Sequence, residues 1–340
     1  MKVIIDAFGG DNAPLEAIKG AALAAKEYDV HIILCGDTEK INTCINENSI
    51  DFGGKQFEII DAPDIFDMHD EPTTLLKKNS NTSLAIAFRA LSEGKADALV
   101  SAGSTGAIVV GGTLIVKRIK GVKRPALASM IPSPGEPYML MDIGANAECR
   151  PEMLAQFGVM SSVYLNRVVG RDNPTIGLLN IGTENTKGGN LQQESYKLLE
   201  KAPINFIGNV ESREMPKGVC DGIVTDGFSG NIALKLIEGT SSTLFKMLKG
   251  VFYKNLINKL AAGILKGGLM TIKKKMDASE VGGAPLLGVA KPVIKAHGNS
   301  DAIAFKNAVK QAIVFTENDV IGAISEDIAK LSLEEKNEKA

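Results

Sequence analysis

Short apolar runs alternate with segments of helical spacing along most of the chain. Strand-like runs of β-branched and aliphatic residues occupy 3–6, 31–34, 57–60, 98–101, 126–131, 138–142, 175–179, 205–208 and 222–225. Segments with apolar positions three and four apart separate many of them, at 15–27, 81–93, 152–169, 191–200 and 302–318. Strands alternating with helices of ten or more residues are typical of βαβ units. The pattern predicts one α/β domain over residues 1–340, a three-layer, mainly parallel sheet with helices on both faces.

Five loops that follow apolar runs are rich in Gly, Ser, Thr, Asn or Asp. They are residues 6–11, 102–106, 142–146, 182–189 and 226–231. In a parallel sheet such loops lie at one end, so we expect them to converge on one ligand site. Taken singly, each is more often an ordinary turn.

The loop at 180–189 reads NIGTENTKGG and carries Thr183, Glu184, Asn185 and Lys187. Its composition suits an anion, and the alternative is a polar surface turn with a mobile lysine. The lysine precedes the glycine pair, which is the wrong order for a nucleotide-binding P-loop. No strand is followed by a dinucleotide fingerprint either, so ATP and NAD are poor candidates, and we expect no cofactor.

Gly103, Ser104, Thr105 and Gly106 open an apolar helix, where free N–H groups favour an anion. The alternative is an ordinary N-cap by either hydroxyl. Ser104 also lies in an AGSTG context, and with Asp226 and His297 it follows the chain order of an α/β-hydrolase triad. A serine hydrolase or thioesterase is therefore a rival hypothesis.

A basic segment without any acid separates Glu238 from Asp277. Its lysines are Lys246, Lys249, Lys254, Lys259, Lys266, Lys273, Lys274 and Lys275. Apolar residues, among them Leu256, Leu260 and Ile264, recur at helical spacing, and Gly263, Gly267 and Gly268 are expected to interrupt the helix. We predict an amphipathic helical hairpin over 240–278 that docks on a membrane surface or an acidic protein. Burial of the stripe in the core or against a second subunit is the alternative. In a third hypothesis the hairpin is the whole function, and the protein is a non-catalytic membrane adaptor.

Composition excludes several classes. The net charge of −2 gives no general attraction to nucleic acid. Four scattered cysteines without a CxxC pair, and three histidines without metal-ligand spacing, argue against disulfides and a metal centre. No signal peptide is visible, and the longest nearly apolar run, 107–116, is too short to span a bilayer. We expect a cytoplasmic protein that can still touch a membrane surface.

Six motifs together resemble the bacterial phosphate acyltransferases of phospholipid synthesis. They are DAFGGDNAP (6–14), SAGSTGA (101–107), DIGAN (142–146), NIGTENTKG (180–188), DGFSGN (226–231) and GGAPLLG (282–288). The resemblance covers nearly the whole chain in order. It implies transfer of an acyl group from acyl-acyl-carrier-protein to inorganic phosphate by a cytosolic homodimer that docks on the membrane. It also implies a fold similar to phosphotransacetylases and isopropylmalate dehydrogenases, and a downstream glycerol-3-phosphate acyltransferase as a partner.

Within that resemblance, candidate roles can be given to residues of the five loops. Phosphate is itself the nucleophile, so the site must hold a dianion near a thioester carbonyl and stabilise an oxyanion. Lys187, Ser104, Thr105 and the N–H groups of residues 103–106 are candidates for phosphate. Asn146, Asn185 and Asn231 suit the oxyanion or thioester, with Thr183, Ser229 and Gly230 beside them. Glu184, Asp226 or His297 would pass a proton to the leaving thiol.

Overall fold

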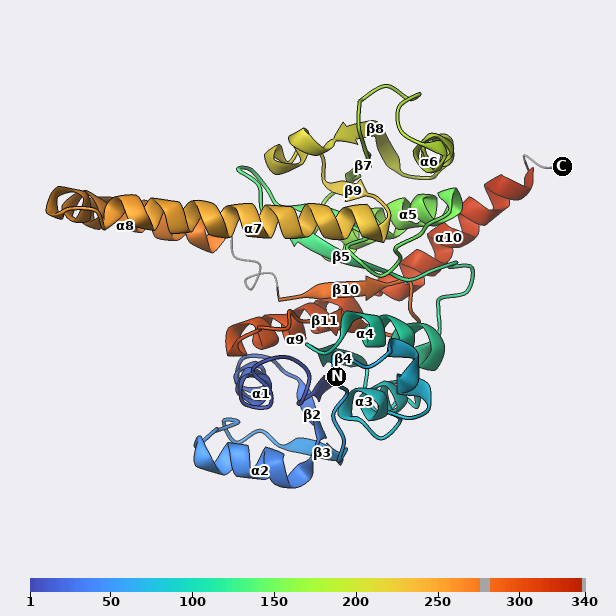
Figure 1. The fold of residues 1–340 in the computed structure, drawn as a ribbon. Coiled ribbons are helices and arrows are strands. Elements are labelled where there is room, and N and C mark those ends of the chain that lie inside the picture. The colour runs from blue at the N-terminus through green and yellow to red at the C-terminus, as the bar shows by residue number, and fades with distance from the viewer. Residues whose placement is uncertain (276–281, 338–340) are drawn as a thin grey trace.

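A computed structural model describes the backbone of residues 1–275 and 282–337. Its described part contains one 11-stranded sheet in the order β3-β2-β1-β4-β11-β10-β5-β6-β9-β7-β8 (Figure 1). The strands are β1 (Lys2–Asp6), β2 (His31–Gly36), β3 (Phe57–Asp61), β4 (Ala98–Ser101), β5 (Ala126–Ile131), β6 (Tyr138–Met141), β7 (Thr175–Asn180), β8 (Asn205–Glu211), β9 (Gly222–Val224), β10 (Ala284–Leu287) and β11 (Val293–Lys295). The mainly parallel α/β sheet is confirmed, and β10 and β11 are additions that the apolar pattern did not predict.

The sheet consists of two parallel blocks that run in opposite directions. We call β3, β2, β1, β4 and β11 the first block, because they are mutually parallel. We call β6, β9, β7 and β8 the second block for the same reason. Between the blocks, β10 is antiparallel to β11 and to β5, and β5 is antiparallel to β6. The carboxyl ends of the two blocks therefore lie at opposite ends of the sheet.

Helices cover both faces, as the three-layer prediction requires. Alternate strand residues enter different cores, since Val3 and Ile5 belong to one cluster and Ile4 to another. The first cluster includes α1 (Leu15–Glu27), α5 (Pro151–Arg167), α9 (Ala302–Glu317) and α10 (Val320–Asn337). The second includes α3 (Ser83–Ser92) and α4 (Thr105–Gly111). The other helical elements outside the arm described below are α2 (Thr38–Glu47), α6 (Asn190–Lys201), η1 (Pro72–Leu76), η2 (Gly112–Val116) and η3 (Ser212–Lys217).

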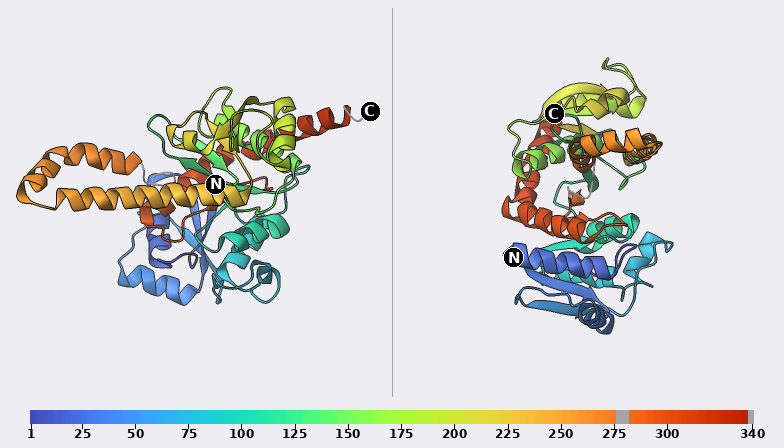
Figure 2. Two further views of the ribbon diagram at one scale, coloured as in Figure 1. Left: turned by 45° about the horizontal axis from the view of Figure 1, so that its top comes forward. Right: turned by 90° about the vertical axis from the view of Figure 1, so that its left-hand side faces the viewer.

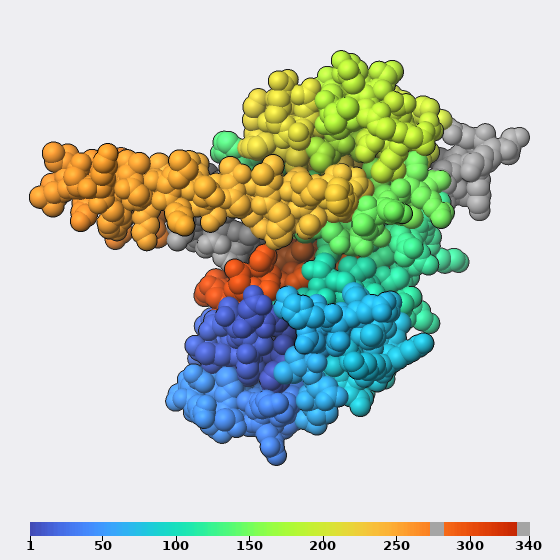
Figure 3. Space-filling view, in the orientation of Figure 1, coloured from blue at the N-terminus to red at the C-terminus, as the bar shows by residue number. Residues whose placement is uncertain are grey.

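The predicted hairpin is an arm made by α7 (Gly227–Phe252) and α8 (Leu256–Lys275), and it projects from the body (Figures 2 and 3). The first turns of α7 pack on the sheet through Ala233, Leu234 and Ile237. The break between the two helices lies at 253–255. Gly263, Gly267 and Gly268 lie within α8, so the prediction that they interrupt the helix is wrong. Residues 276–278 of the expected hairpin are outside the described residues. In the described part of the chain, no helix has both the length and the apolar character needed to cross a bilayer.

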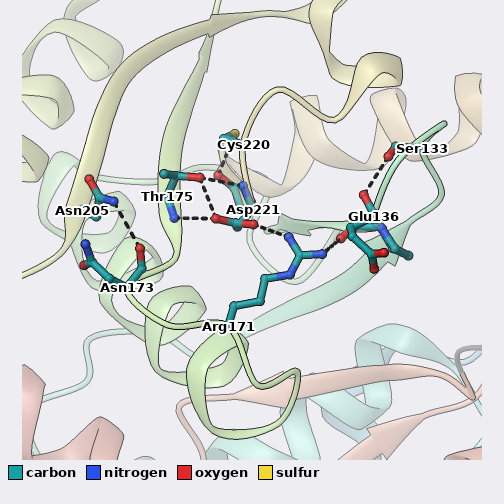
Figure 4. Close-up of polar contacts among 10 residues, drawn as sticks. Ser133, Glu136, Arg171, Asn173, Thr175, Asn205, Cys220 and Asp221 are labelled. Carbon is teal, nitrogen blue, oxygen red and sulfur yellow. Dashed lines mark hydrogen bonds and ion pairs between the residues drawn. The ribbon is translucent and has the colours of Figure 1, made fainter.

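A polar network holds the amino ends of the second block together (Figure 4). Arg171 pairs with Asp221, and its other nitrogen donates to the carbonyl of Pro137. Thr175 donates to Asp221 Oδ2 from its backbone nitrogen (2.8 Å) and its hydroxyl (2.7 Å). Burial by itself would raise the pKa of Asp221, but the bonds from Thr175 and the Arg171 charge hold it below the usual range. This network joins β6, β7 and β9 far from their carboxyl-end loops.

We expect Asp221→Asn to lower the free energy of unfolding by about 1–3 kcal/mol at neutral pH, because charge-assisted bonds are lost. The carboxylate stabilises the fold above its unfolded pKa, so the difference between wild type and variant should shrink as the pH falls below about 4. Denaturant unfolding at pH 7 and pH 3 measures both effects. Asp327→Asn, which breaks an exposed pair with Lys330, is the control and should change stability by less than about 0.5 kcal/mol. Equal effects of the two substitutions would contradict the role of the network.

Candidate active site

Three polar side chains end adjacent strands of the first block, and we call them the strand-end row. Asp6 ends β1, Ser101 ends β4 and Lys295 ends β11, where Lys295 is in register with Ser101. The residues two positions earlier, Ile4, Leu99 and Val293, all belong to the α3–α4 core. Because side chains alternate along a strand, the whole row points to the face that α3 and α4 cover.

Asp6 is fully engaged in hydrogen bonds. Its Oδ1 accepts from Ser83 Oγ (2.6 Å) and its Oδ2 from Ser101 Oγ (2.7 Å). Burial raises the pKa of Asp6, and the two serine hydroxyls oppose that rise. Gly9 permits this packing, since an added Cβ would lie 2.6 Å from Asp6 Oδ2 and 2.7 Å from the nitrogen of Gly103. The carboxyl group therefore organises the loops after β1 and β4.

Lys295 is the member of the row that sequence reasoning missed. Its Nζ donates to the carbonyl of Ala296 (2.8 Å), and among the described residues it forms no ion pair. Burial and, to a smaller extent, the charge of Lys235 on α7 lower its pKa to about 8, against the pull of Asp11 and Asp6. The sequence offered one indication: Lys295 directly follows the apolar residues Val293 and Ile294. From the sequence, only His297 is a candidate in this stretch.

The loop after β11 joins this group. The nitrogen of Ala296 donates to the carbonyl of Ser101 (2.9 Å), and the nitrogen of Asp11 donates to that of Gly298 (2.7 Å). His297 is exposed in this loop, close in the chain to the row. Ser104 holds the N-cap position of α4, but its hydroxyl makes no capping bond. Thr105 and Gly106 form the first turn, where Gly106 faces Pro72.

The loops after β6 and β9 form a second, tightly bonded junction. Asp142 accepts from the backbone nitrogens of Leu127, Gly144, Ala145 and Asn146 at 2.7–3.1 Å. Burial raises the pKa of Asp142, and these bonds oppose the rise. Asn146 Nδ2 already donates to Asp142 and to the carbonyl of Pro125, so its amide hydrogens are not free for an oxyanion.

Asp226 is the N-cap of α7, accepting from the nitrogen of Ser229 (2.8 Å). Gly230 fits against the Asp142 junction so closely that an added Cβ would lie 1.9 Å from the carbonyl oxygen of Asp142. Asn231 follows with an exposed side chain, near Gly144. Its side-chain amide is therefore an accessible donor at this junction.

The 182–189 loop is anchored within the second block. Asn180 Nδ2 donates to the carbonyl of Lys187 (3.1 Å), and Asn209 Nδ2 donates to that of Glu184 (2.8 Å). The side chains of Thr183, Glu184, Asn185 and Lys187 are exposed. Among the described residues, no ion pair involves Lys187, so its ammonium is available to an anion.

The assumption that all five loops follow strands of one direction is wrong, although the loop after β6 still packs, through Ile143 and Ala145, against the core that contains α4. Loops 6–11 and 102–106 follow first-block strands, and loops 142–146, 182–189 and 226–231 follow second-block strands, which end at the opposite side. Helix α7 starts at the end of β9 and packs on β6 (Figure 1). Figure 3 shows a hollow between α7 and the lower part of the molecule.

The proposed hydrolase triad is not assembled. Among the described residues, no hydrogen bond joins Ser104 to His297 or His297 to Asp226. Asp226 belongs to the other loop group and caps a helix. A triad requires the nucleophile, base and orienting acid in hydrogen-bond reach. This geometry weighs against the hydrolase hypothesis.

Comparisons with known proteins agree with the fold and give the family. The family model described as fatty acid synthesis protein matches residues 1–323. A protein named phosphate acyltransferase from Alkaliphilus oremlandii is 46% identical over 338 residues, covering 98% of this chain and 99% of its own. Its namesake from Bacillus pumilus is 44% identical over 97% and 98%. A phosphotransacetylase structure from Streptococcus pyogenes covers 97% of this chain and 94% of its own at 17% identity, with a TM-score of 0.62.

The fold is thus similar to that of the phosphotransacetylase structures. The chain belongs to the phosphate acyltransferase family, and it is an acyltransferase of fatty acid and lipid synthesis.

The close approach at Gly230 gives a stability prediction. Gly230→Ala should lower the free energy of unfolding by about 1–3 kcal/mol, because the methyl group collides with the backbone of Asp142. Gly239→Ala is the matched control on the same helix, since nothing lies within 4 Å of an added Cβ there. That change should be neutral or stabilise by up to about 1 kcal/mol through helix propensity. Denaturant titration of both variants measures the two free energies of unfolding. A Gly230→Ala protein as stable as Gly239→Ala would contradict the close packing of Gly230 against the backbone of Asp142.

Proposed function

We propose that the protein transfers a fatty acyl group from acyl-acyl-carrier-protein to inorganic phosphate, giving acyl phosphate for phospholipid synthesis. The observation that carries this is the full-length similarity to proteins named phosphate acyltransferase. A phosphate oxygen bonds to the acyl carbon, the C–S bond breaks, and the thiolate leaves with the electron pair and is then protonated.

Direct attack by phosphate agrees with the state of the cysteines. Burial raises the pKa of Cys149 and of Cys220 to about 12, and it raises those of Cys35 and Cys44. A thiol acts as a nucleophile as its thiolate, so none of the four suits a covalent acyl intermediate at neutral pH. Ser104 lacks a bonded base, as shown above. Phosphate is then the nucleophile that the site has to position.

The proposed roles divide between the two loop groups. Lys187 contacts the phosphate from its exposed loop, and Asn231 donates to the thioester oxygen as negative charge develops there. Ser104, Thr105 and the backbone of Gly103 and Gly106 support the phosphate from the first block. His297 or Glu184 supplies the proton to the thiolate.

The arm is proposed to dock on the membrane and to meet the acidic carrier protein. Leu256, Leu260 and Ile264 are 73%, 65% and 86% exposed, so their stripe is not buried in the core. Lys254 and Lys259 lie on the same exposed arm and would attract anionic headgroups. We further propose a cytoplasmic homodimer that is peripheral at the inner membrane face and passes acyl phosphate to a glycerol-3-phosphate acyltransferase.

The proposed reaction makes a direct prediction. Purified protein should consume an acyl carrier thioester only with inorganic phosphate present, and should release acyl phosphate and free carrier protein in equal amounts. Mass spectrometry of the carrier and hydroxylamine trapping of acyl phosphate measure both products. Thioester loss that is independent of phosphate would instead support a thioesterase, and no turnover at all would support the adaptor hypothesis.

Replacing Lys187 with alanine tests the role of its loop. We expect the KM for phosphate to rise about tenfold, as for loss of one charge-assisted contact, with the KM for the acyl donor within about twofold. Lys197→Ala, which removes an exposed lysine of α6, is the control. An unchanged KM for phosphate in Lys187→Ala would show that Lys187 does not bind the phosphate.

The double substitution Leu256→Glu, Leu260→Glu tests the arm. Two leucines that enter the bilayer would contribute several kcal/mol to membrane binding. Sedimentation of the double variant with anionic liposomes should therefore fall by about tenfold or more, while activity on a soluble donor is kept. Leu114→Glu places one such charge on an exposed leucine away from the arm and should bind liposomes like wild type. Persistent liposome binding by the double variant would mean that the stripe faces a second subunit.

A further inference from the structure

Side-chain amides from two strands hold the backbone of the turn that carries Lys187. The carbonyl of Glu184 accepts from the nitrogen of Lys187 (3.1 Å) and from Nδ2 of Asn209 on β8 (2.8 Å). The carbonyl of Lys187 accepts from Nδ2 of Asn180, the last residue of β7 (3.1 Å). Because β7 and β8 are neighbouring parallel strands, the sheet holds this turn both three residues before the lysine and at the lysine itself.

The stem of the Lys187 side chain is confined as well. An added Cβ on Gly182 would lie 2.9 Å from Lys187 Cγ and 2.9 Å from Glu184 Oε2, so both side chains pass over that glycine. On the other side, Gly188 has a φ of +86°, and an added Cβ there would lie 2.6 Å from Asn180 Oδ1. The backbone and the stem are therefore fixed by close contacts, and the exposed end of the lysine carries its charge from a defined base.

Asn209 makes this bond at a cost to the fold. Its side chain is only 8% exposed, and its buried Oδ1 has no hydrogen-bond partner within the described part of the chain. The carbonyl of Glu184 can only accept, so the amide must present Nδ2 to it and leave Oδ1 unpaired. A buried acceptor without a partner destabilises the folded state, and an apolar side chain of similar shape would avoid that penalty. The amide is therefore better explained by what it holds than by the stability it adds.

The opposite end of β8 offers a bond of the same kind outside the candidate site. Asn205 Nδ2 donates to the carbonyl of Asn173 (3.1 Å), at the amino ends of the second block (Figure 4). That loop carries none of the candidate substrate-binding residues. Asn205 is thus a matched control for Asn209, with the same side chain and strand and an equivalent bond to a loop carbonyl.

We propose that Asn209 is a positioning residue for phosphate binding, which acts through the carbonyl of Glu184 to hold Lys187 in place, with Asn180 as the second anchor. This assignment rests on the proposed function, in which Lys187 contacts the phosphate. A lysine whose backbone and stem are already ordered loses less conformational freedom when an anion binds, so the affinity is higher. Asn209 itself does not touch the phosphate. Its effect passes through the turn and should disappear when the Lys187 ammonium is absent.

The test compares Asn209→Leu with the control Asn205→Leu in the full chain, each with and without Lys187→Ala. Leucine is close to asparagine in shape and lacks the donor. Steady-state kinetics give the KM values for phosphate and for acyl-acyl-carrier-protein, and calorimetry gives the affinity for inorganic phosphate. For Asn209→Leu we expect the KM for phosphate to rise about fivefold, as for loss of one neutral hydrogen bond, and the affinity to fall equally, with the donor KM within about twofold. Asn205→Leu should leave both KM values within about twofold of wild type.

Two further readouts separate positioning from a purely structural role. In the Lys187→Ala background, Asn209→Leu should change the KM for phosphate by less than about twofold, because two residues that act as one unit are not additive. The midpoint of thermal unfolding of Asn209→Leu should stay within about 4 °C of wild type, since the unpaired acceptor is removed together with the donor.

An unchanged KM for phosphate in a folded Asn209→Leu protein would overturn the proposal, as would an equal rise in Asn205→Leu or a full fivefold effect without the lysine. If Asn209→Leu does not fold, Asn209→Ser, which removes the amide with a smaller side chain, is judged by the same criteria. Failure of both to fold would show a structural role and overturn it. Phosphate affinity that depends on Lys187 and Asn209 without acyl transfer would refute the proposed function alone. Acyl transfer whose KM for phosphate depends on Lys187 but not on Asn209 would refute this assignment alone.

Discussion

The reversal of strand direction at the centre of the sheet is the constraint on which the site depends. Because β5 pairs antiparallel with β6 and with β10, the second block runs against the first. A single parallel sheet would collect its polar loops along one edge. Here the reversal places the loops on strands of opposite direction, and a long helix, α7, starts at the end of β9 and packs on β6. The position of α7 is thus a consequence of sheet topology.

Buried carboxyl groups fix the loops at the carboxyl ends of the two blocks. Asp6 binds two serine hydroxyls at the first-block end, and Asp142 binds four backbone nitrogens at the second-block end. Each is paired with a glycine, Gly9 or Gly230, whose missing side chain permits the close approach. These contacts make rigid loop conformations, and they leave the nearby exposed amide and ammonium groups free for substrate. Rigid support beneath accessible donors is what stabilisation of a developing negative charge requires.

The arm combines two properties that a folded core cannot accommodate together. Its apolar side chains are exposed, and the first turns of α7 pack on the body through Ala233, Leu234 and Ile237. A helix of this length carries the apolar surface away from the sheet, while its first turns remain packed on the second block. One element therefore joins a surface suited to lipid or protein contact with the region proposed to bind phosphate.

The sequence by itself determined the elements and the family. Alternation of apolar runs with helical spacing predicted α1 with its observed bounds, Leu15–Glu27, and β4 and β5 likewise, because local periodicity reports which face is buried. The six motifs identified the family, and the acid-free amphipathic segment predicted the arm. Strand direction is not encoded in periodicity, so only the tertiary structure showed the two opposed blocks. Lys295 could be distinguished only in the tertiary structure, since the charged residues that act on its pKa, Asp6, Asp11 and Lys235, are distant from it in the chain.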